Sequence, residues 1–207
     1  MNRGLLIEFL IPLLSVAATT VALQAAGADL AVAALFYVPG AGWPQGGREP
    51  WEFLYRYGNI PAFALGALGV IAFALGFFVE RLRRYRAAAL FVVAFLALGP
   101  GLIVNTVFKD HWGRPRPAEI VQFGGTEVFR PFWSPGGQGQ GRSFPSGHAA
   151  IGFFVLAPFF VFRKTSPGLA RRALGAGFLY GALMGLARII QGGHFLTDVI
   201  WSGILVY

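Results

Sequence analysis

Long apolar runs separated by short polar segments make up most of this chain of 207 residues. The hydrocarbon core of a membrane is about 30 Å thick and an α-helix rises about 1.5 Å per residue, so a run of about 20 apolar residues predicts a membrane-spanning helix. Five windows are close to this length, at residues 5–28, 60–79, 87–108, 145–162 and 173–190, and a sixth covers 195–207. The pattern predicts an all-α fold, a polytopic membrane helix bundle with about six transmembrane helices.

Three of these windows carry further signals. Gly99, Pro100 and Gly101 interrupt the third, where the missing backbone donor of proline predicts a kink. The sixth is too short to cross fully, so we expect either that the natural chain continues beyond Tyr207 or that this helix is incomplete. The first resembles a secretory signal, with Arg3 before the apolar run and small residues at 25–28, but the run is long for a signal and favours a spanning helix.

Composition agrees with a membrane protein, since 56% of the residues are hydrophobic, 13% are charged and the mean hydropathy is +0.60. Little sequence lies outside the windows, so we expect one membrane-embedded domain over 1–207, with amino-terminal helices and an outer interfacial segment in 1–86 and a catalytic core in 87–207. The absence of cysteine excludes disulfides and a thiolate nucleophile. The net charge of +8 is dispersed between apolar runs, which does not favour nucleic-acid binding.

The orientation follows from the short loops, because positive residues are retained on the cytoplasmic side. Arginine and lysine are concentrated in the loops 81–86 and 163–172, which places both loops inside. Segments 29–59, 109–144 and 191–194 then face the outside. We expect a multi-pass protein of the cell inner membrane with its active site facing the periplasm or exterior. The outer segments also contain many positive residues, which need a reason other than topology.

Two outer segments have a distinct composition. The run from Leu30 to Tyr37 is apolar but too short to span, and Trp43 and Trp51 follow it. This pattern suits either a lateral entrance for lipid or an ordinary aromatic belt at the interface, and the sequence leaves both open. The glycine-rich stretch 134–142 predicts a flexible outer loop.

Three polar clusters interrupt the apolar chain, and the predicted topology brings all three to the outer surface. They are the run 109–117, the sequence Pro145-Ser146-Gly147-His148, and the set Arg188, His194 and Asp198. Lys109, Arg116 and Arg188 supply permanent charge and many donors, which suits the oxygens of a phosphate. Ser146 and the Gly147 backbone add donors at the start of a helix. Together these residues predict a phosphate-binding cage.

The same clusters supply candidate catalytic groups. His194 and Asp198 are four residues apart at the start of a helical stretch, so they share a face, and the carboxylate can hold the imidazole in one tautomer. A neutral, oriented imidazole is a nucleophile. His148 lies on a different helix and is available to donate a proton to the departing oxygen.

Each of these residues has a plainer explanation when taken alone. Arg188 can snorkel from a helix end, and Lys109, Arg114 and Arg116 can contact lipid headgroups. Ser146 can be a simple helix cap, and a histidine at an interface can be merely solvated. Asp198 is the exception, because a carboxylate inside an apolar span costs about 2.5 to 3.5 kcal/mol unless it has a partner. The joint occurrence on one surface favours an active site.

A metal site is a further alternative, since Asp110 and His111 follow Lys109 directly. Only three histidines are present, they lie on three different segments, and no second carboxylate is near His148 or His194. Many cations surround them. This is a poor ligand set for a metal ion, so we expect no metal and no cofactor.

These motifs resemble the type 2 phosphatidic acid phosphatase superfamily, which has a lysine, six residues and Arg-Pro, then Pro-Ser-Gly-His, then Ser-Arg, five residues, histidine, three residues and aspartate. Lys109 to Pro117, Pro145 to His148, and Arg188 with His194 and Asp198 keep the order and spacings, and Ala187 replaces the usual serine. The resemblance covers the chain from about residue 87 onward. The run 109–117 and Phe123-Gly124-Gly125 are similar to bacterial lipid A phosphatases.

The resemblance implies a six-helix membrane core and metal-independent hydrolysis through a phosphohistidine. It assigns phosphate binding to Lys109, Arg116, Ser146, Gly147 and Arg188, the general acid to His148, the nucleophile to His194, and the orientation of that nucleophile to Asp198. We expect a phosphohydrolase for a phosphorylated membrane lipid of the lipid A, undecaprenyl pyrophosphate or phosphatidylglycerol phosphate class.

Three other functions use parts of the same pattern. A phosphotransferase would pass the phosphate from the same histidine to a lipid acceptor. A vanadium-dependent haloperoxidase resembles the same cage, but those enzymes are soluble and this chain has continuous spans. A non-enzymatic anion-binding transporter would need the cations without the catalysis. The sequence leaves open the lipid, the choice of monoester or pyrophosphate, and the oligomeric state.

Overall fold

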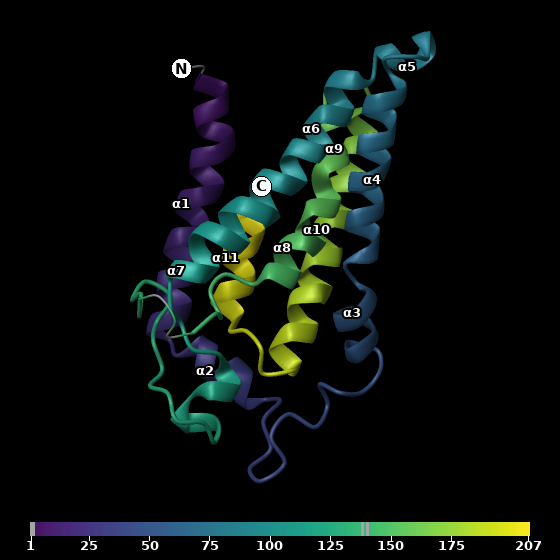
Figure 1. Ribbon diagram of the computed structural model, residues 1–207. Helices are drawn as coiled ribbons and strands as arrows, with labels where there is room; N and C mark the ends of the chain where they lie inside the picture. Colours follow the sequence, from purple (N-terminus) through teal and green to yellow (C-terminus); the bar gives the residue numbers. More distant parts are fainter. Residues whose placement is uncertain (1–2, 138, 140) are drawn as a thin grey trace.

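A computed structural model describes residues 3–137, 139 and 141–207, and it describes side chains from residue 7 onward (Figure 1). The α-helices are α1 (Arg3–Ala25), α2 (Ala28–Ala34), α3 (Trp51–Tyr57), α4 (Ile60–Leu75), α5 (Glu80–Arg83), α6 (Arg86–Leu96), α7 (Lys109–His111), α8 (Gly147–Phe153), α9 (Ala157–Phe162), α10 (Pro167–Ile190) and α11 (Leu196–Val206). A π-helical segment, Ala97–Phe108, joins α6 to α7, and 3-10 turns cover Pro117–Glu119, Val121–Phe123 and Phe154–Leu156.

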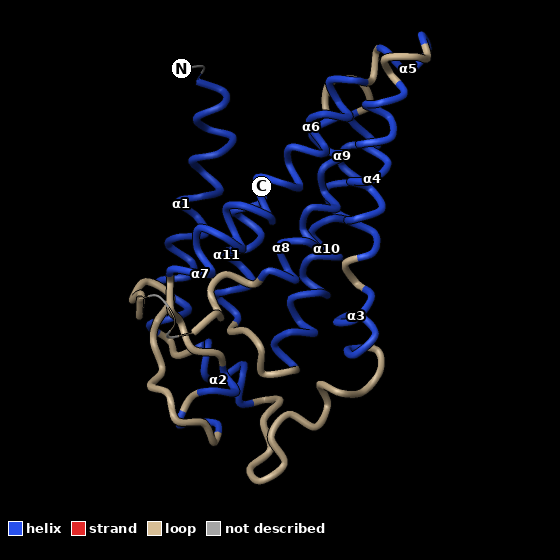
Figure 2. Tube along the Cα trace, viewed as in Figure 1, coloured by secondary structure: helices blue, strands red, loops and turns tan. Residues whose placement is uncertain are grey.

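All of the described residues lie in helices, loops or two isolated bridges, so the prediction of an all-α fold is confirmed (Figure 2). Four helical stretches are long and apolar enough to cross a membrane: Ile7–Ala25, Trp51–Leu75, Arg86–His111 and Pro167–Ile190. Two shorter apolar stretches, Gly147–Phe162 and Leu196–Val206, correspond to the fourth and sixth predicted windows. The second span begins at Trp51, nine residues before the predicted start, because α3 extends it beyond the purely apolar run.

The regular α-helix breaks at the predicted proline. Pro100 has no N–H to donate, and the chain adopts π-helical turns from Ala97 onward in place of α-helical turns. The side-chain amide of Asn105 donates to the Pro100 carbonyl at 2.6 Å, which holds this side chain against the irregular turn. This segment leads directly into Lys109, so the irregular helix sets the position of the first polar cluster.

Helix α10 packs against α8 and α11, and glycines allow the close approach. A Cβ atom at Gly181 would lie 2.2 Å from the ring of Phe153, and one at Gly185 would lie 2.2 Å from Val199. Small residues let membrane helices approach closely and gain dispersion contacts. The same packing brings the amino-terminal end of α8, the carboxy-terminal end of α10 and the beginning of α11 together.

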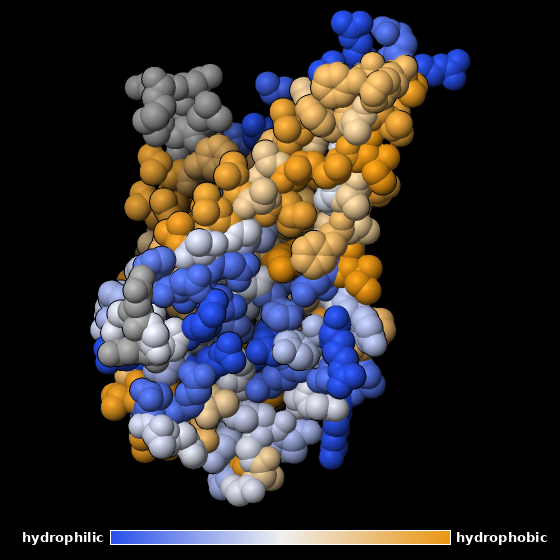
Figure 3. Space-filling view, in the orientation of Figure 1, coloured by the Kyte–Doolittle hydropathy of each residue, from blue (hydrophilic) through white to orange (hydrophobic). Residues whose placement is uncertain are grey.

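An apolar band separates two polar parts of the molecule (Figure 3). In this view the band covers α4, α6 and the described side chains of α1, hydrophilic side chains lie beyond it at the tip that carries α5, and a larger polar region covers the lower end. We call the lower polar end, which carries the described loop residues 112–137, 139 and 141–146 and the turn 191–195, the site end. The two positively charged loops predicted to be inside lie at the other end, together with the start of α1 (Figure 1). The segments predicted to be inside therefore lie at one end of the molecule, and the segments predicted to be outside lie at the other end.

Candidate active site

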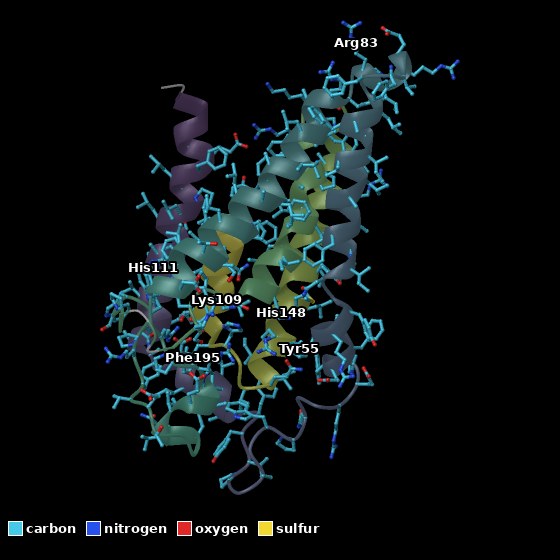
Figure 4. All side chains as sticks on the ribbon, viewed as in Figure 1. Tyr55, Arg83, Lys109, His111, His148 and Phe195 are labelled. Carbon is cyan, nitrogen blue, oxygen red and sulfur yellow. The ribbon has the colours of Figure 1, made fainter. Side chains whose placement is uncertain are left out.

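The site end brings the three polar clusters together. Lys109 begins α7 and Arg116 precedes a 3-10 turn, while Ser146, Gly147 and His148 lie at the start of α8. Arg188 is in the last turn of α10, His194 lies between α10 and α11, and Asp198 is in the first turn of α11. Lys109 is within electrostatic reach of Arg116 and Arg188, and His148 is within reach of Arg188, His194 and Lys109. Figure 4 shows Lys109 and His148 close together in this part of the molecule.

Two arginines of the cluster keep unused donors. The Nε atoms of Arg116 and Arg188 are buried and have no hydrogen-bond partner among the described residues. A buried N–H without a partner carries a desolvation cost of roughly 1 to 3 kcal/mol, and more when the group is charged. The cost is offset when an anion occupies the space, and the neighbouring Lys109 adds to the attraction. The arrangement is suited to binding phosphate oxygens.

Two glycines leave room for these cations. A Cβ atom on Gly147 would lie 3.1 Å from Nζ of Lys109 and 2.5 Å from Oδ1 of Asn105. A Cβ atom on Gly193 would lie 2.2 Å from Nη2 of Arg188. A side chain at position 193 would shift the Arg188 guanidinium, and one at position 147 would crowd Asn105 and the Lys109 ammonium.

The wall beside Arg188 comes from the amino-terminal part of the chain. Nη1 of Arg188 donates to the side-chain oxygen of Gln191, whose amide donates to the Gly46 carbonyl at 2.9 Å. The Arg188 guanidinium carbon lies 4.5 Å from the ring centre of Tyr55. The Tyr55 ring stacks on His148 with 5.0 Å between centroids (Figure 4). One aromatic side chain from α3 therefore contacts both a cage arginine and the candidate acid.

Ser146 serves as the cap of α8. Its Oγ accepts from the Ala149 N–H at 3.4 Å, and its own N–H donates to the Asp198 carbonyl at 3.3 Å. The hydroxyl of Ser202, one turn along α11, donates to the Ser146 carbonyl at 2.9 Å. These bonds attach the start of α8 to α11, so His148 and Asp198 are held in one framework.

His194 is buried, with 1% of its surface exposed. Its Nδ1 donates to the Ser143 carbonyl at 2.6 Å. Because a carbonyl only accepts, the single ring proton of the neutral form is on Nδ1 and Nε2 carries the lone pair. Burial lowers the pKa of His194 to about 4, although the nearby Asp198 carboxylate acts in the opposite direction. The imidazole is therefore neutral and available as a nucleophile at neutral pH.

Asp198 contacts His194 less directly than the sequence predicts. Its Oδ2 lies 3.8 Å from Nδ1 of His194, beyond hydrogen-bond distance, and accepts instead from the Ser143 hydroxyl at 2.6 Å and the Phe195 N–H at 2.8 Å. The carboxylate lies at ion-pair distance from the imidazole, and the hydrogen-bond acceptor of Nδ1 is the Ser143 carbonyl. Ser143 is the intermediate, since its hydroxyl binds Asp198 and its carbonyl binds His194.

Sequence reasoning missed Asp29 and the position of Arg114. Both side chains are fully buried, and Nη2 of Arg114 donates to Asp29 at 2.7 Å while Nη1 donates to Asp198. The alternative that Arg114 contacts lipid headgroups is therefore wrong. A signal was available in the sequence, because Asp29 is an isolated carboxylate at the end of an apolar window and needs a cationic partner. The sequence does not say which of the many arginines supplies it.

Asp110 and His111 lie apart from this cluster. Asp110 forms an exposed ion pair with Arg142 at 2.5 Å, and the ring of His111 bonds the Val107 carbonyl at 3.0 Å. Within the part of the chain that the structure describes, no three histidine or carboxylate side chains converge as metal ligands would. These two residues have structural partners of their own.

Comparison with known proteins agrees with the motifs. Residues 87–207, more than half of the chain, match the PAP2 superfamily. The chain belongs to the PAP2 superfamily. This confirms the resemblance drawn from the three motifs, and the eight predicted site residues all lie within the matched region.

Relatives of the chain within the PAP2 superfamily have a common name. A protein of Francisella tularensis subsp. novicida named lipid A 4'-phosphatase is 39% identical over 186 residues, which cover 86% of this chain and 81% of that protein. Proteins of the same name from Rhizobium leguminosarum and Rhizobium etli are 34% identical over 134 residues, covering 54% and 49% of their lengths. The predicted similarity to lipid A phosphatases is confirmed. No solved structure matches the chain.

Proposed function

We propose that this PAP2 protein is an integral membrane phosphatase that hydrolyses a phosphate from a lipid through a phosphohistidine on His194. One observation carries the proposal. A neutral, buried histidine with its lone pair on Nε2 lies in the same cluster as two arginines whose buried Nε–H groups have no partner. This combination supplies a nucleophile and an anion site together, whereas an anion-binding transporter needs only the second.

In the first step, Nε2 of His194 attacks the phosphorus atom while the bond from phosphorus to the lipid oxygen breaks. His148 donates a proton to the departing oxygen, so the lipid leaves as an alcohol. Lys109, Arg116 and Arg188 stabilise the charge that develops on the three phosphoryl oxygens. Ser143 keeps the proton on Nδ1 of His194.

In the second step, water attacks the phosphohistidine. His148, which has lost its proton, accepts one from the water, and the bond between phosphorus and nitrogen breaks. Inorganic phosphate leaves and His194 regains its lone pair. The site therefore returns to its starting protonation state without a metal ion in any step.

The fold supports an amphiphilic substrate. An apolar groove of about 560 Å³ lies between α4, α6, the π-helical segment and α8, and its lining includes Asn105, whose Oδ1 adjoins Gly147 of the cage. The groove is lined by Phe63, Gly66, Ala67, Val70, Val93, Leu96, Ala97, Pro100, Gly101, Asn105 and Ile151. A lipid with its phosphate in the cage has an acyl chain within reach of this groove.

We place lipid A first among the substrate classes, ahead of undecaprenyl pyrophosphate and phosphatidylglycerol phosphate. The names and similarity of the relatives support this order. The test is to assay the purified chain against these three lipids and to measure free phosphate and the lipid product. Free phosphate from lipid A that disappears in His194→Ala would support the proposal. Transfer of phosphate to a second lipid would show a phosphotransferase, and no turnover of any lipid would overturn the enzymatic assignment.

Metal independence is part of the proposal because Lys109 and the cage arginines provide the positive charge that a metal would supply. Activity should persist in a chelator and should be inhibited by vanadate, which resembles the five-coordinate phosphorus of the transition state. Activity lost in chelator and restored by a divalent metal would contradict this part of the mechanism.

We also propose that the site end faces the periplasm or exterior of an inner membrane. Val128 is 72% exposed at the site end, and Arg83 lies at the opposite end (Figure 4). In intact spheroplasts, an impermeant thiol reagent should label Val128→Cys and should label Arg83→Cys only after lysis. The reverse pattern would show the opposite orientation.

A further inference from the structure

A buried ion network at the site end includes a residue outside the region that matches the PAP2 superfamily. Asp29 lies in the first turn of α2, in the amino-terminal part of the chain, and its side chain is fully buried. Its Oδ1 accepts from the Thr197 N–H at 2.9 Å, and its Oδ2 accepts from the Thr197 hydroxyl at 2.7 Å and from Arg114 at 2.7 Å. Both carboxylate oxygens are used.

Arg114 connects Asp29 to the candidate site. Nη2 binds Asp29, Nη1 binds both Asp198 and the Thr197 hydroxyl, and Nε donates to the Arg130 carbonyl at 2.9 Å. The guanidinium has partners in every direction and cannot move without breaking several buried bonds. Its position is therefore fixed by Asp29 from one side and by Asp198 from the other.

The network continues to the candidate nucleophile. Asp198 accepts from the Ser143 hydroxyl at 2.6 Å, and the Ser143 carbonyl accepts from Nδ1 of His194 at 2.6 Å. Asp29 also binds the backbone N–H of Thr197, the residue directly before Asp198. Displacement of Asp29 would therefore disturb Asp198 through Arg114 and through the start of α11.

The charges of the network have a second consequence. One guanidinium between two carboxylates leaves a net charge of −1 in a buried place, and the nearer carboxylate oxygen is 3.8 Å from His194. The imidazole becomes positively charged when Nε2 is phosphorylated. Because Asp29 shares Arg114, the negative charge of Asp198 is not fully neutralised and can stabilise that cation.

We propose that Asp29 is a positioning residue for His194, acting through Arg114, Asp198 and Ser143. The proposal rests on the proposed function, in which His194 is the nucleophile. It assigns a defined catalytic support to the amino-terminal part of the chain, whose sequence contains none of the three motifs.

The experiment compares Asp29→Asn with the wild type in full-length protein, using Glu80→Gln as a control because Glu80 also pairs with an arginine but is exposed at the opposite end. The kcat on a phosphorylated substrate should fall about 10- to 100-fold in Asp29→Asn, the scale known for groups that orient metal-bound histidines. Inhibition by inorganic phosphate, which reports the cage, should be unchanged. Glu80→Gln should match the wild type.

Two outcomes would overturn the proposal. Wild-type kcat in Asp29→Asn would show that the nucleophile does not depend on Asp29, and a parallel loss of kcat, phosphate inhibition and thermal midpoint would show a merely structural role.

Thr197→Val is a milder second variant, because it removes one bond to Asp29 and one from Arg114, and it should lower kcat without changing phosphate inhibition. Wild-type kcat in this variant would also count against the network. An inactive wild type would refute the proposed function itself.

Discussion

The amino-terminal and carboxy-terminal parts of this chain contribute to the site in different ways. Residues 87–207 carry the three motifs and all eight predicted site residues, at spacings that a sequence comparison detects. Residues 3–86 carry no motif. They nevertheless supply Asp29, which pairs with Arg114 in the network that leads to the candidate nucleophile, and Tyr55, which stacks on the candidate acid. They also supply α4, which forms one wall of the apolar groove.

The difference reflects what each contribution requires. Groups that react with phosphate must be held in a precise geometry, because a misplacement of about 1 Å can cost about 100-fold in rate, and this restricts the residue types and spacings within each motif. Supporting groups need only reach the same place in space, and they can come from any segment that packs there. The amino-terminal part therefore looks like a set of ordinary apolar helices although it contacts the site. Its match to the Francisella protein nevertheless extends well beyond the 121 residues of the PAP2 region.

Removal of His194 should have the largest effect, because it deletes the attacking atom. In His194→Ala, turnover should fall to background, a loss of about 10⁶-fold by analogy with other covalent catalysts, and no phosphoenzyme should form. Rapid quenching should trap an acid-labile phosphoenzyme in the wild type. A phosphoenzyme in the variant, or phosphate found on His148, would show that the roles are assigned wrongly.

Removal of His148 should produce a loss that depends on the leaving group. A lipid alkoxide departs poorly without a proton, so His148→Ala should lose about 10²- to 10⁴-fold on lipid monoesters. p-Nitrophenol is acidic and needs little assistance, so a larger fraction of activity should remain on p-nitrophenyl phosphate. Equal losses on both substrates would mean that His148 is not the acid. These two variants test the separate roles assigned to the two histidines of the carboxy-terminal part.

Blocking the groove should affect long lipids selectively. Ala67→Phe places a ring in the groove wall formed by α4. If the acyl chain of the substrate loses the burial of about two methylene groups there, KM for a long-chain substrate should rise about tenfold. KM for a short-chain phosphate should not change. Leu90→Phe is the control, because Leu90 is 51% exposed on α6 outside the groove. Equal effects on long and short chains would exclude the groove as an acyl site.

Replacing Tyr55 should have a smaller effect. Tyr55→Leu removes the aromatic ring that contacts the Arg188 guanidinium and stacks on His148. A cation–π contact contributes about 0.5 to 2 kcal/mol. We expect kcat/KM to fall about three- to tenfold with the phosphoenzyme still formed. Tyr55→Phe keeps the ring and should be close to the wild type. Loss in both variants would indicate that the hydroxyl group matters, and wild-type activity in both would remove Tyr55 from the site.

The smallest expected effect is that of pH on His194, whose charge should not change near neutral pH. Burial disfavours the cation, so with a pKa of about 4 the imidazole stays neutral above that pH and gains a proton only below it. NMR of the ring nitrogens should therefore show the Nδ1–H tautomer throughout the range from about pH 5 to 8. A titration near the ordinary pKa of about 6.5 would contradict the buried, neutral nucleophile.

Local patterns in the sequence were sufficient for several features of this protein. The lengths of the apolar runs predicted the helices, because crossing a membrane imposes a length and a polarity on each segment. The break at Pro100 follows from a missing donor, and the motif spacings indicated the PAP2 superfamily. These features depend on neighbours within a few turns, so the sequence alone determined them.

Other features were decided only by the tertiary structure. The partner of Nδ1 in His194 is a backbone carbonyl 51 residues away, and every residue offers such a group, so no sequence pattern identifies it. Asp29 and Arg114 are 85 positions apart, and the choice among 17 cationic residues depends on how α2 packs against α11. Sequence shows that a buried carboxylate needs a partner, because an unpaired charge is costly, but only packing decides which partner it has.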